Sequence, residues 1–66
     1  MVLFRVTGLM STQRNYIPFD CKVYASDSEE ASAKAIGLVM LKEMNGRDRY
    51  LKIYDVLAEE VKHESL

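Results

Sequence analysis

The sequence predicts one small α+β domain over residues 1–66, with the element order β-β-α-β. Residues 17–25 alternate without a break between apolar positions and polar or edge-tolerant positions, which is the period of a strand with one buried face. A similar alternating segment precedes this strand, and residues 26–29 have the composition of a helix start. We therefore expect a three-stranded, largely antiparallel sheet with one helix packed on one face.

Length and charge limit the classes to which the protein can belong. A chain of 66 residues is near the lower end of what folds without a disulfide or a metal. The net charge of −1 argues against a general phosphate-binding surface, because affinity for nucleic acid depends on clustered Lys and Arg. The single cysteine, Cys21, cannot form an internal disulfide, and no segment has the pattern of an export signal or a membrane span. We therefore expect a cytoplasmic protein with no membrane partner.

The first strand is expected over residues 2–8, where Gly8 would mark either a bulge or the end of the strand. A short polar turn at residues 11–15 predicts that the first two strands form an antiparallel hairpin. Pro18 lacks a backbone donor, which places the second strand at an edge of the sheet. The positions expected to face the core are Val2, Phe4 and Val6 in the first strand and Ile17, Phe19, Cys21, Val23 and Ala25 in the second.

The helix is expected to run from this start to about Met44, with Asn45 and Gly46 ending it. Ser26 would cap its N-terminus while the Glu29 side chain reaches back, as in a capping box. At 100° per residue the apolar residues form two stripes on opposite sides. The stripe expected against the sheet comprises Ala31, Ala35, Leu38 and Val39. The opposite stripe comprises Ala33, Ile36, Met40 and Met44.

This opposite stripe has two interpretations. It can consist of scattered surface apolar residues, which are common, or it can be the buried face of a contact with another chain. We favour a symmetric homodimer, because small residues would let a second helix approach and methionine adapts to an imperfect partner surface. The interface would contain Ala33, Ile36, Met40 and Met44, with Met40 at its centre.

The third strand is expected over residues 50–56 and could lie beside the first strand after a crossover through the helix. Leu51 and Ile53 would point toward the core. The alternation breaks at residues 55–57, which predicts a bulge, although a short helix capped by Asp55 is the alternative. Residues 62–66 are expected to fray.

No group of residues has the pattern of an active site. His63 has no second His or free Cys nearby to complete a metal site, and the three glycines form no phosphate loop. No nucleophile stands beside a base. We therefore expect no enzymatic activity, no cofactor and no metal, and we expect the inward-facing thiol of Cys21 to be inert.

The outward face of the sheet is the candidate binding surface, because all four tyrosines fall on outward positions together with basic residues. Such aromatic side chains can anchor a protein interface, stack nucleic-acid bases, or only pair across strands. The modest basic charge favours a protein partner over RNA. The residues assigned to this surface are Tyr16, Lys22, Tyr24, Tyr50, Lys52 and Tyr54.

One set of residues spans most of the chain: Phe4–Gly8, Pro18, Phe19, Val23, Ala25, Glu30, Ala31, Lys34, Arg49, Lys52 and Ile53. This set resembles the archaeal ribosomal protein LX and its eukaryotic relatives. In place of the Gly-Ser-x-His motif and the basic cluster that follow the helix in that family, residues 45–49 are Asn-Gly-Arg-Asp-Arg. The resemblance implies an RNA-associated module.

A second pattern covers the passage from strand to helix: Phe19-x-x-x-Val23-Tyr24-Ala25, followed by Ser28-Glu29-Glu30-Ala31. It is similar to the same passage in small phage-encoded inhibitors of bacterial RNA polymerase, whose arginine-rich final strand is not reproduced here. This resemblance implies a phage protein that modulates its host. We expect a small protein–protein interaction module, and the second resemblance implies a phage-type modulator of a host protein. The alternatives are an RNA-associated module and a structural homo-oligomer.

Overall fold

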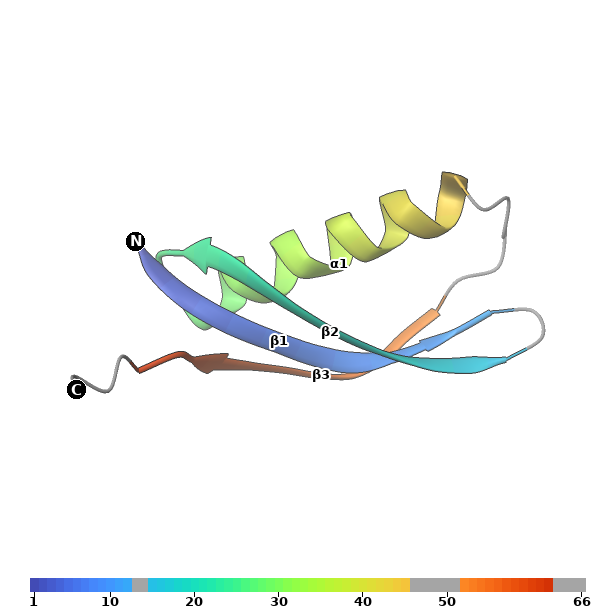
Figure 1. Ribbon diagram of the computed structural model, residues 1–66, viewed down its shortest axis with the longest axis horizontal. Helices are drawn as coiled ribbons and strands as arrows, with labels where there is room; N and C mark the ends of the chain where they lie inside the picture. The colour runs from blue at the N-terminus through green and yellow to red at the C-terminus, as the bar shows by residue number, and fades with distance from the viewer. Residues whose placement is uncertain (13–14, 46–51, 63–66) are drawn as a thin grey trace.

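The computed structural model describes residues 1–12, 15–45 and 52–62, and the side chains of these residues except at 43–45. The elements are β1 (Val2–Ser11), β2 (Tyr16–Ala25), α1 (Ser28–Asn45) and β3 (Lys52–Glu60). The predicted order β-β-α-β is confirmed, and so is the position of the third strand beside the first. The sheet is antiparallel with the strand order β2-β1-β3, and α1 lies on one of its faces (Figure 1). Over the described residues, no helix is both long and apolar enough to cross a membrane.

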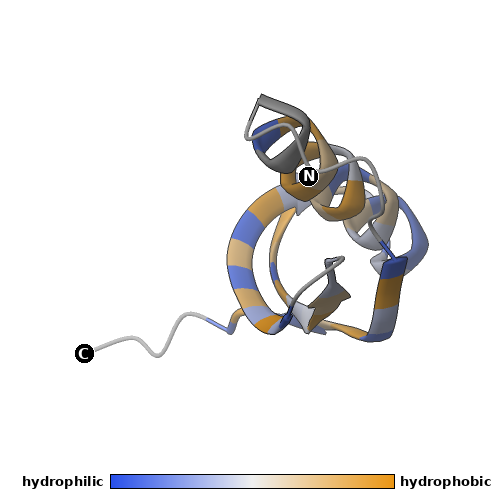
Figure 2. Ribbon diagram, turned by 90° about the vertical axis from the view of Figure 1, so that its right-hand side faces the viewer, coloured by the Kyte–Doolittle hydropathy of each residue, from blue (hydrophilic) through white to orange (hydrophobic). Residues whose placement is uncertain are grey.

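The β1–β2 hairpin pairs without interruption from Val2 opposite Ala25 to Ser11 opposite Tyr16. Viewed end-on, the sheet curls toward the helix, and hydrophobic and hydrophilic bands alternate along the strands (Figure 2). The residues predicted to face the core do so, with Phe4, Val6, Phe19, Val23 and Ala25 buried and Val2 and Cys21 partly buried. Ile17 has the same orientation but is 36% exposed. Pro18 lies on an edge strand, as predicted.

Gly8 lies opposite Phe19, and β1 continues past it rather than ending there. A Cβ atom at Gly8 would lie 2.5 Å from two ring carbons of Phe19. A larger residue at position 8 would therefore force the phenyl ring of Phe19 to move. Because the ring occupies the space above Gly8, Phe19 is only 8% exposed although it belongs to an edge strand.

The predicted bulge is present in β3, and no helix capped by Asp55 forms. Thr7 pairs with Leu57 and Leu9 pairs with Tyr54, so that Asp55 and Val56 together occupy the interval opposite Gly8. Asp55 adopts a φ of 54°, in the left-handed region that Asp tolerates better than most residues. Because of the extra residue, Ala58 pairs with Val6 and its side chain lies on the helix side of the sheet, where it packs on the core.

The helix cap was predicted one residue too early. Asp27, rather than Ser26, occupies the cap position: its Oδ1 accepts the backbone N–H of Glu30 at 2.8 Å. Glu30, rather than Glu29, reaches back, and its Oε2 accepts the hydroxyl of Ser26 at 2.8 Å. Ala25 is still a fully buried strand residue, so the chain needs residues 26 and 27 to turn before α1 can begin.

The prediction that Leu38 packs against the sheet is wrong, because its side chain is 55% exposed. The buried line of α1 runs through Ala31, Ala35 and Val39 at intervals of four residues, and Leu38 lies to one side of it. Ile36, expected on the far side, is half-buried. Ala33 and Met40 are exposed as expected, and the side chain of Met44 lies outside the described residues.

Candidate interaction surfaces

Three of the predicted binding residues lie near the β1–β2 turn, on the face of the sheet that is turned away from α1. Tyr16 and Lys52 are paired to the same residue, Ser11, from opposite sides. Tyr54 pairs with Leu9, in the neighbouring row of the sheet. Because the pairs in an antiparallel sheet bring side chains of one face together, these three residues form one group.

The other predicted residues do not join this group. Tyr24 pairs with Leu3, and Lys22 pairs with Arg5, at the opposite end of the same face. Tyr24 is eight residues from Tyr16 along one strand, which corresponds to about 26 Å. Tyr50 lies outside the described residues. Among the described residues, the tyrosines of the open face therefore fall into two separate places, Tyr16 with Tyr54 and Tyr24 alone, rather than one continuous site.

Charged residues separate the two groups. The guanidinium of Arg5 binds the carboxylate of Asp20 through two of its nitrogen atoms, with Nε 3.0 Å from Oδ1. The hydrogen bond from Arg5 lowers the pKa of Asp20 below its usual value. Glu59 pairs with Arg5 from the other side. The cation of Arg5 is thus balanced by neighbouring carboxylates.

Apolar residues that the sequence did not single out extend the first group. We call Leu9, Tyr16, Pro18, Tyr54 and Leu57 the turn-end patch. Tyr16 is 70% exposed, Leu57 53% and Tyr54 41%. Leu9 and Pro18 pair with each other and connect the two tyrosines across the sheet. The face on which Leu57 lies depends on the position of the bulge in β3. The sequence therefore predicts that face only if the bulge is located correctly.

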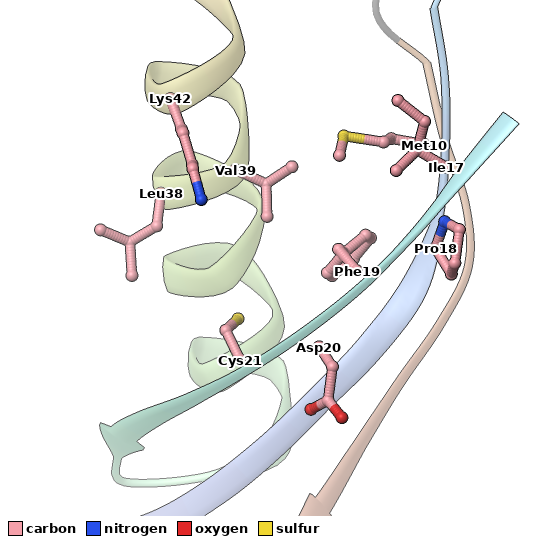
Figure 3. Close-up of a pocket in the computed structure, with 9 residues that line it drawn as sticks. All are labelled: Met10, Ile17, Pro18, Phe19, Asp20, Cys21, Leu38, Val39 and Lys42. Atoms are coloured by element: carbon pink, nitrogen blue, oxygen red, sulfur yellow. The ribbon is translucent and has the colours of Figure 1, made fainter. Parts of the chain in front are cut away.

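A groove lies on the other side of the sheet, between β2 and the C-terminal half of α1 (Figure 3). It has a volume of about 460 Å³ and is lined by Met10, Ile17 and Phe19 from the sheet and by Leu38, Val39 and Lys42 from the helix, among others. A shallower hollow continues along β2 and is lined in part by Tyr24, Leu38 and Leu41. Apolar surface therefore follows the outer edge of β2.

Cys21 also lines the groove, and its sulfur points toward α1 (Figure 3). Burial raises the pKa of this thiol, and the negative charge of Asp20 raises it further. A raised pKa lowers the fraction of thiolate, which is the nucleophilic form of cysteine.

Comparison with family models, with curated proteins and with solved structures finds no match to this chain. Over residues 1–12, 15–45 and 52–62, no three His, Cys, Asp or Glu side chains are grouped so as to hold a metal ion. Two surfaces remain as candidates for function, the turn-end patch and the groove along β2.

Proposed function

We propose that this protein is a small non-enzymatic module that binds another protein through its turn-end patch. The observation that carries this proposal is the contiguity of the patch, in which two exposed tyrosines are joined by Leu9 and Pro18 and flanked by Leu57. Exposed apolar patches of this kind are typical of interaction sites. Tyrosine is enriched among the residues that contribute most to binding at protein interfaces.

A protein partner fits this face better than RNA. Over the part of the chain that the structure describes, the cations on this face are Arg5, Lys22 and Lys52, and they are accompanied by the carboxylates of Asp20 and Glu59. Arg5 is already engaged by Asp20. Phosphate binding needs uncompensated basic side chains, whereas aromatic anchors surrounded by balanced polar residues are common in protein interfaces.

The proposal extends to the class of module. A chain of this size that covers part of a larger protein's surface would act as a modulator, in the manner of the phage-encoded inhibitors that its strand-to-helix passage resembles. The host cytoplasm would then be its place of action. What supports this extension is the residue pattern from Phe19 to Ala31, together with the exposed patch on the opposite face of the sheet.

The test is capture of a partner from nuclease-treated and untreated bacterial lysate, with the captured proteins identified by mass spectrometry. We expect one protein to be retained equally from both lysates. The Tyr16→Ser/Tyr54→Ser variant should retain at least about tenfold less of it. Met40→Ser is the matched control, because it removes an exposed apolar side chain from α1 and should leave capture unchanged.

Salt and nuclease distinguish the alternatives. Binding to RNA through three cations would weaken roughly 20- to 40-fold between about 50 and 200 mM salt, whereas an aromatic interface should change little. Capture that disappears after nuclease treatment would contradict the proposal and favour the module of the ribosomal type. Capture unchanged in the double tyrosine variant would show that the tyrosines serve only to pair across strands.

A further inference from the structure

The outer edge of β2 presents a defined row of backbone groups. The N–H of Thr12 donates to the carbonyl of Asn15 at 2.8 Å, which makes this a hydrogen-bonded pair of the hairpin. Hydrogen-bonded and non-bonded pairs alternate along antiparallel strands. The even-numbered residues of β2 therefore direct their backbone groups away from β1. These residues are Tyr16, Pro18, Asp20, Lys22 and Tyr24.

The same alternation is visible on the other side of β1. The N–H of Val61 donates to the carbonyl of Leu3 at 2.9 Å, so the odd-numbered residues of β1 face β3. Since Leu3 pairs with Tyr24, the backbone groups of Tyr24 face outward. Its carbonyl oxygen in fact accepts a hydrogen bond from Nζ of Lys34 at 2.8 Å.

Two positions on this edge thus differ from an ordinary strand. Pro18 has no N–H to donate. The carbonyl of Tyr24, six residues later, already has a donor. Between them lie Asp20 and Lys22, whose side chains carry opposite charges and point to the open face.

We propose that two copies of this chain pair through their β2 edges, antiparallel about a two-fold axis at Cys21, to form a six-stranded sheet. In this register Asp20 of each copy lies opposite Lys22 of the second copy, which places two pairs of opposite charges at the interface. Pro18 lies opposite Tyr24 of the second copy. The nitrogen of Pro18, which has no hydrogen to donate, then faces the carbonyl of Tyr24. That carbonyl already accepts a hydrogen bond from Lys34.

Registers displaced by two residues lack this fit. One displacement places Asp20 opposite Asp20 and directs Pro18 at the carbonyl of Lys22, which would be left without a donor. The other places Lys22 opposite Lys22. Like charges directly opposite each other are destabilising in antiparallel pairs, so the charge pattern and the backbone pattern select the same register.

Apolar contacts accompany this pairing. Both helices lie on the same face of the joined sheet, and Phe19 lies opposite Val23 of the second copy. Leu38 and Leu41, exposed on the flank of α1 that lines the hollow along β2, face the new interface. On the open face, Tyr24 of the second copy is placed next to Pro18. The pairing thus brings the separate aromatic group of one copy to the turn-end patch of the other.

Cys21 provides the first test, because it lies opposite itself at the two-fold axis in a non-hydrogen-bonded pair. The Cα separation in such a pair is about 4.5 Å, within the range that a disulfide spans. Diamide at mildly alkaline pH should remove two protons and two electrons from the two thiols and link the copies. The variant Cys21→Ser/Ile17→Cys is the control: its cysteine is also at the edge, but it faces Ala25 and should not link.

Charge provides the second test, read by light scattering under reducing conditions at tens of micromolar. The parent should have twice the mass of one 7.6 kDa chain. Asp20→Lys and Lys22→Asp should each be monomeric, since each sets like charges opposite each other. Mixing the two variants should restore the double mass, because opposite charges then face each other, and this result also shows that both variants fold.

A parent of single-chain mass would overturn the proposal, as would equal linking of the two cysteine positions. So would a mixture that stays monomeric. A dimer that Met40→Glu disrupts and Asp20→Lys leaves intact would also overturn it, in favour of the helix stripe that contains Ala33 and Met40.

Discussion

Near the start of α1, Val6, Val23 and Ala25 of the sheet are buried together with Ala31 and Ala35 of the helix. Near the β1–β2 turn, Met10 and Ile17 share with Val39 and Lys42 a groove of about 460 Å³. We refer to these regions as the closed half and the grooved half. Both have the same alternation of side chains along β1 and β2.

The difference between the halves lies in the helix. Alanines at positions 31 and 35 let the start of α1 lie directly on the sheet, and the helix diverges from the sheet toward its C-terminal end (Figure 1). Larger side chains at 38, 39 and 42 line the groove that opens there. The period of a strand therefore decides which face a residue occupies, but not how deeply it is buried: in the grooved half Met10 is 8% exposed and Ile17 36%.

The largest effect is expected where the halves meet, at Phe19. Phe19→Ala should lower the free energy of unfolding by about 3–5 kcal/mol, because the ring is 8% exposed and fills the space above Gly8. Ile17→Ala, on the same face but 36% exposed, should lower it by about 1–2 kcal/mol. Urea denaturation followed by circular dichroism measures both. Equal losses would mean that Phe19 is no better packed than Ile17.

Overpacking of the closed half is the next test. Ala35→Leu should cost about 1–3 kcal/mol, because a buried alanine in direct contact with the sheet leaves no room for a larger side chain. Ala33→Leu, on the exposed side of the same helix, should stay within about 0.5 kcal/mol of the parent. Thermal unfolding of the two variants decides the matter, and a stable Ala35→Leu protein would refute the close contact.

The cap of α1 belongs to the closed half and should contribute less. Asp27→Ala should cost about 0.5–2 kcal/mol, since the N–H of Glu30 loses its acceptor. Asp27→Asn keeps an acceptor and should be close to the parent. If Ser26→Ala proved more costly than Asp27→Ala in urea denaturation, the cap would lie at Ser26 after all.

The smallest effect is that of pH. Hydrogen bonds from Arg5 lower the pKa of Asp20, and hydrogen bonds from Ser26 and then Lys34 lower the pKa of Glu30. A carboxyl group whose folded pKa lies below its unfolded value stabilises the fold above the unfolded pKa, and this contribution is lost as pH falls through the folded pKa. The urea midpoint should therefore decline in acid, and the decline should be shallower in Asp20→Asn/Glu30→Gln. An unchanged decline would show that neither carboxyl group contributes.

The strands and the bulge could be predicted because each leaves a local signal. Alternation marks the strands, and its failure at Asp55 marks the bulge. The cap was misplaced by one residue because Ser26 and Asp27 are both good capping residues and each has a glutamate three residues later. The choice between them depends on where β2 stops, which is set by the burial of Ala25.

Distances within a face are harder to predict than the face itself. The alternation of side chains places Tyr16 and Tyr24 on the same side of the sheet. It does not show that most of the length of β2 separates them. In the same way, helical periodicity gives the angle of Leu38 around the axis and not the line along which the helix touches the sheet. That line depends on the tilt of α1, which arises from contacts of the whole domain.

The bulge at Asp55 has a consequence for aggregation. A three-stranded sheet has two edges, and chains whose edges both accept new strands can stack without limit into fibres. Asp55, with its φ of 54°, bends β3 and interrupts the even row of backbone groups along that edge. In the proposed dimer the other edge, that of β2, is covered by a second copy of the chain. Concentrated solutions of this protein should accordingly stay free of amyloid-like fibrils, and Asp55 deletion, which straightens β3, should be the change that first permits them.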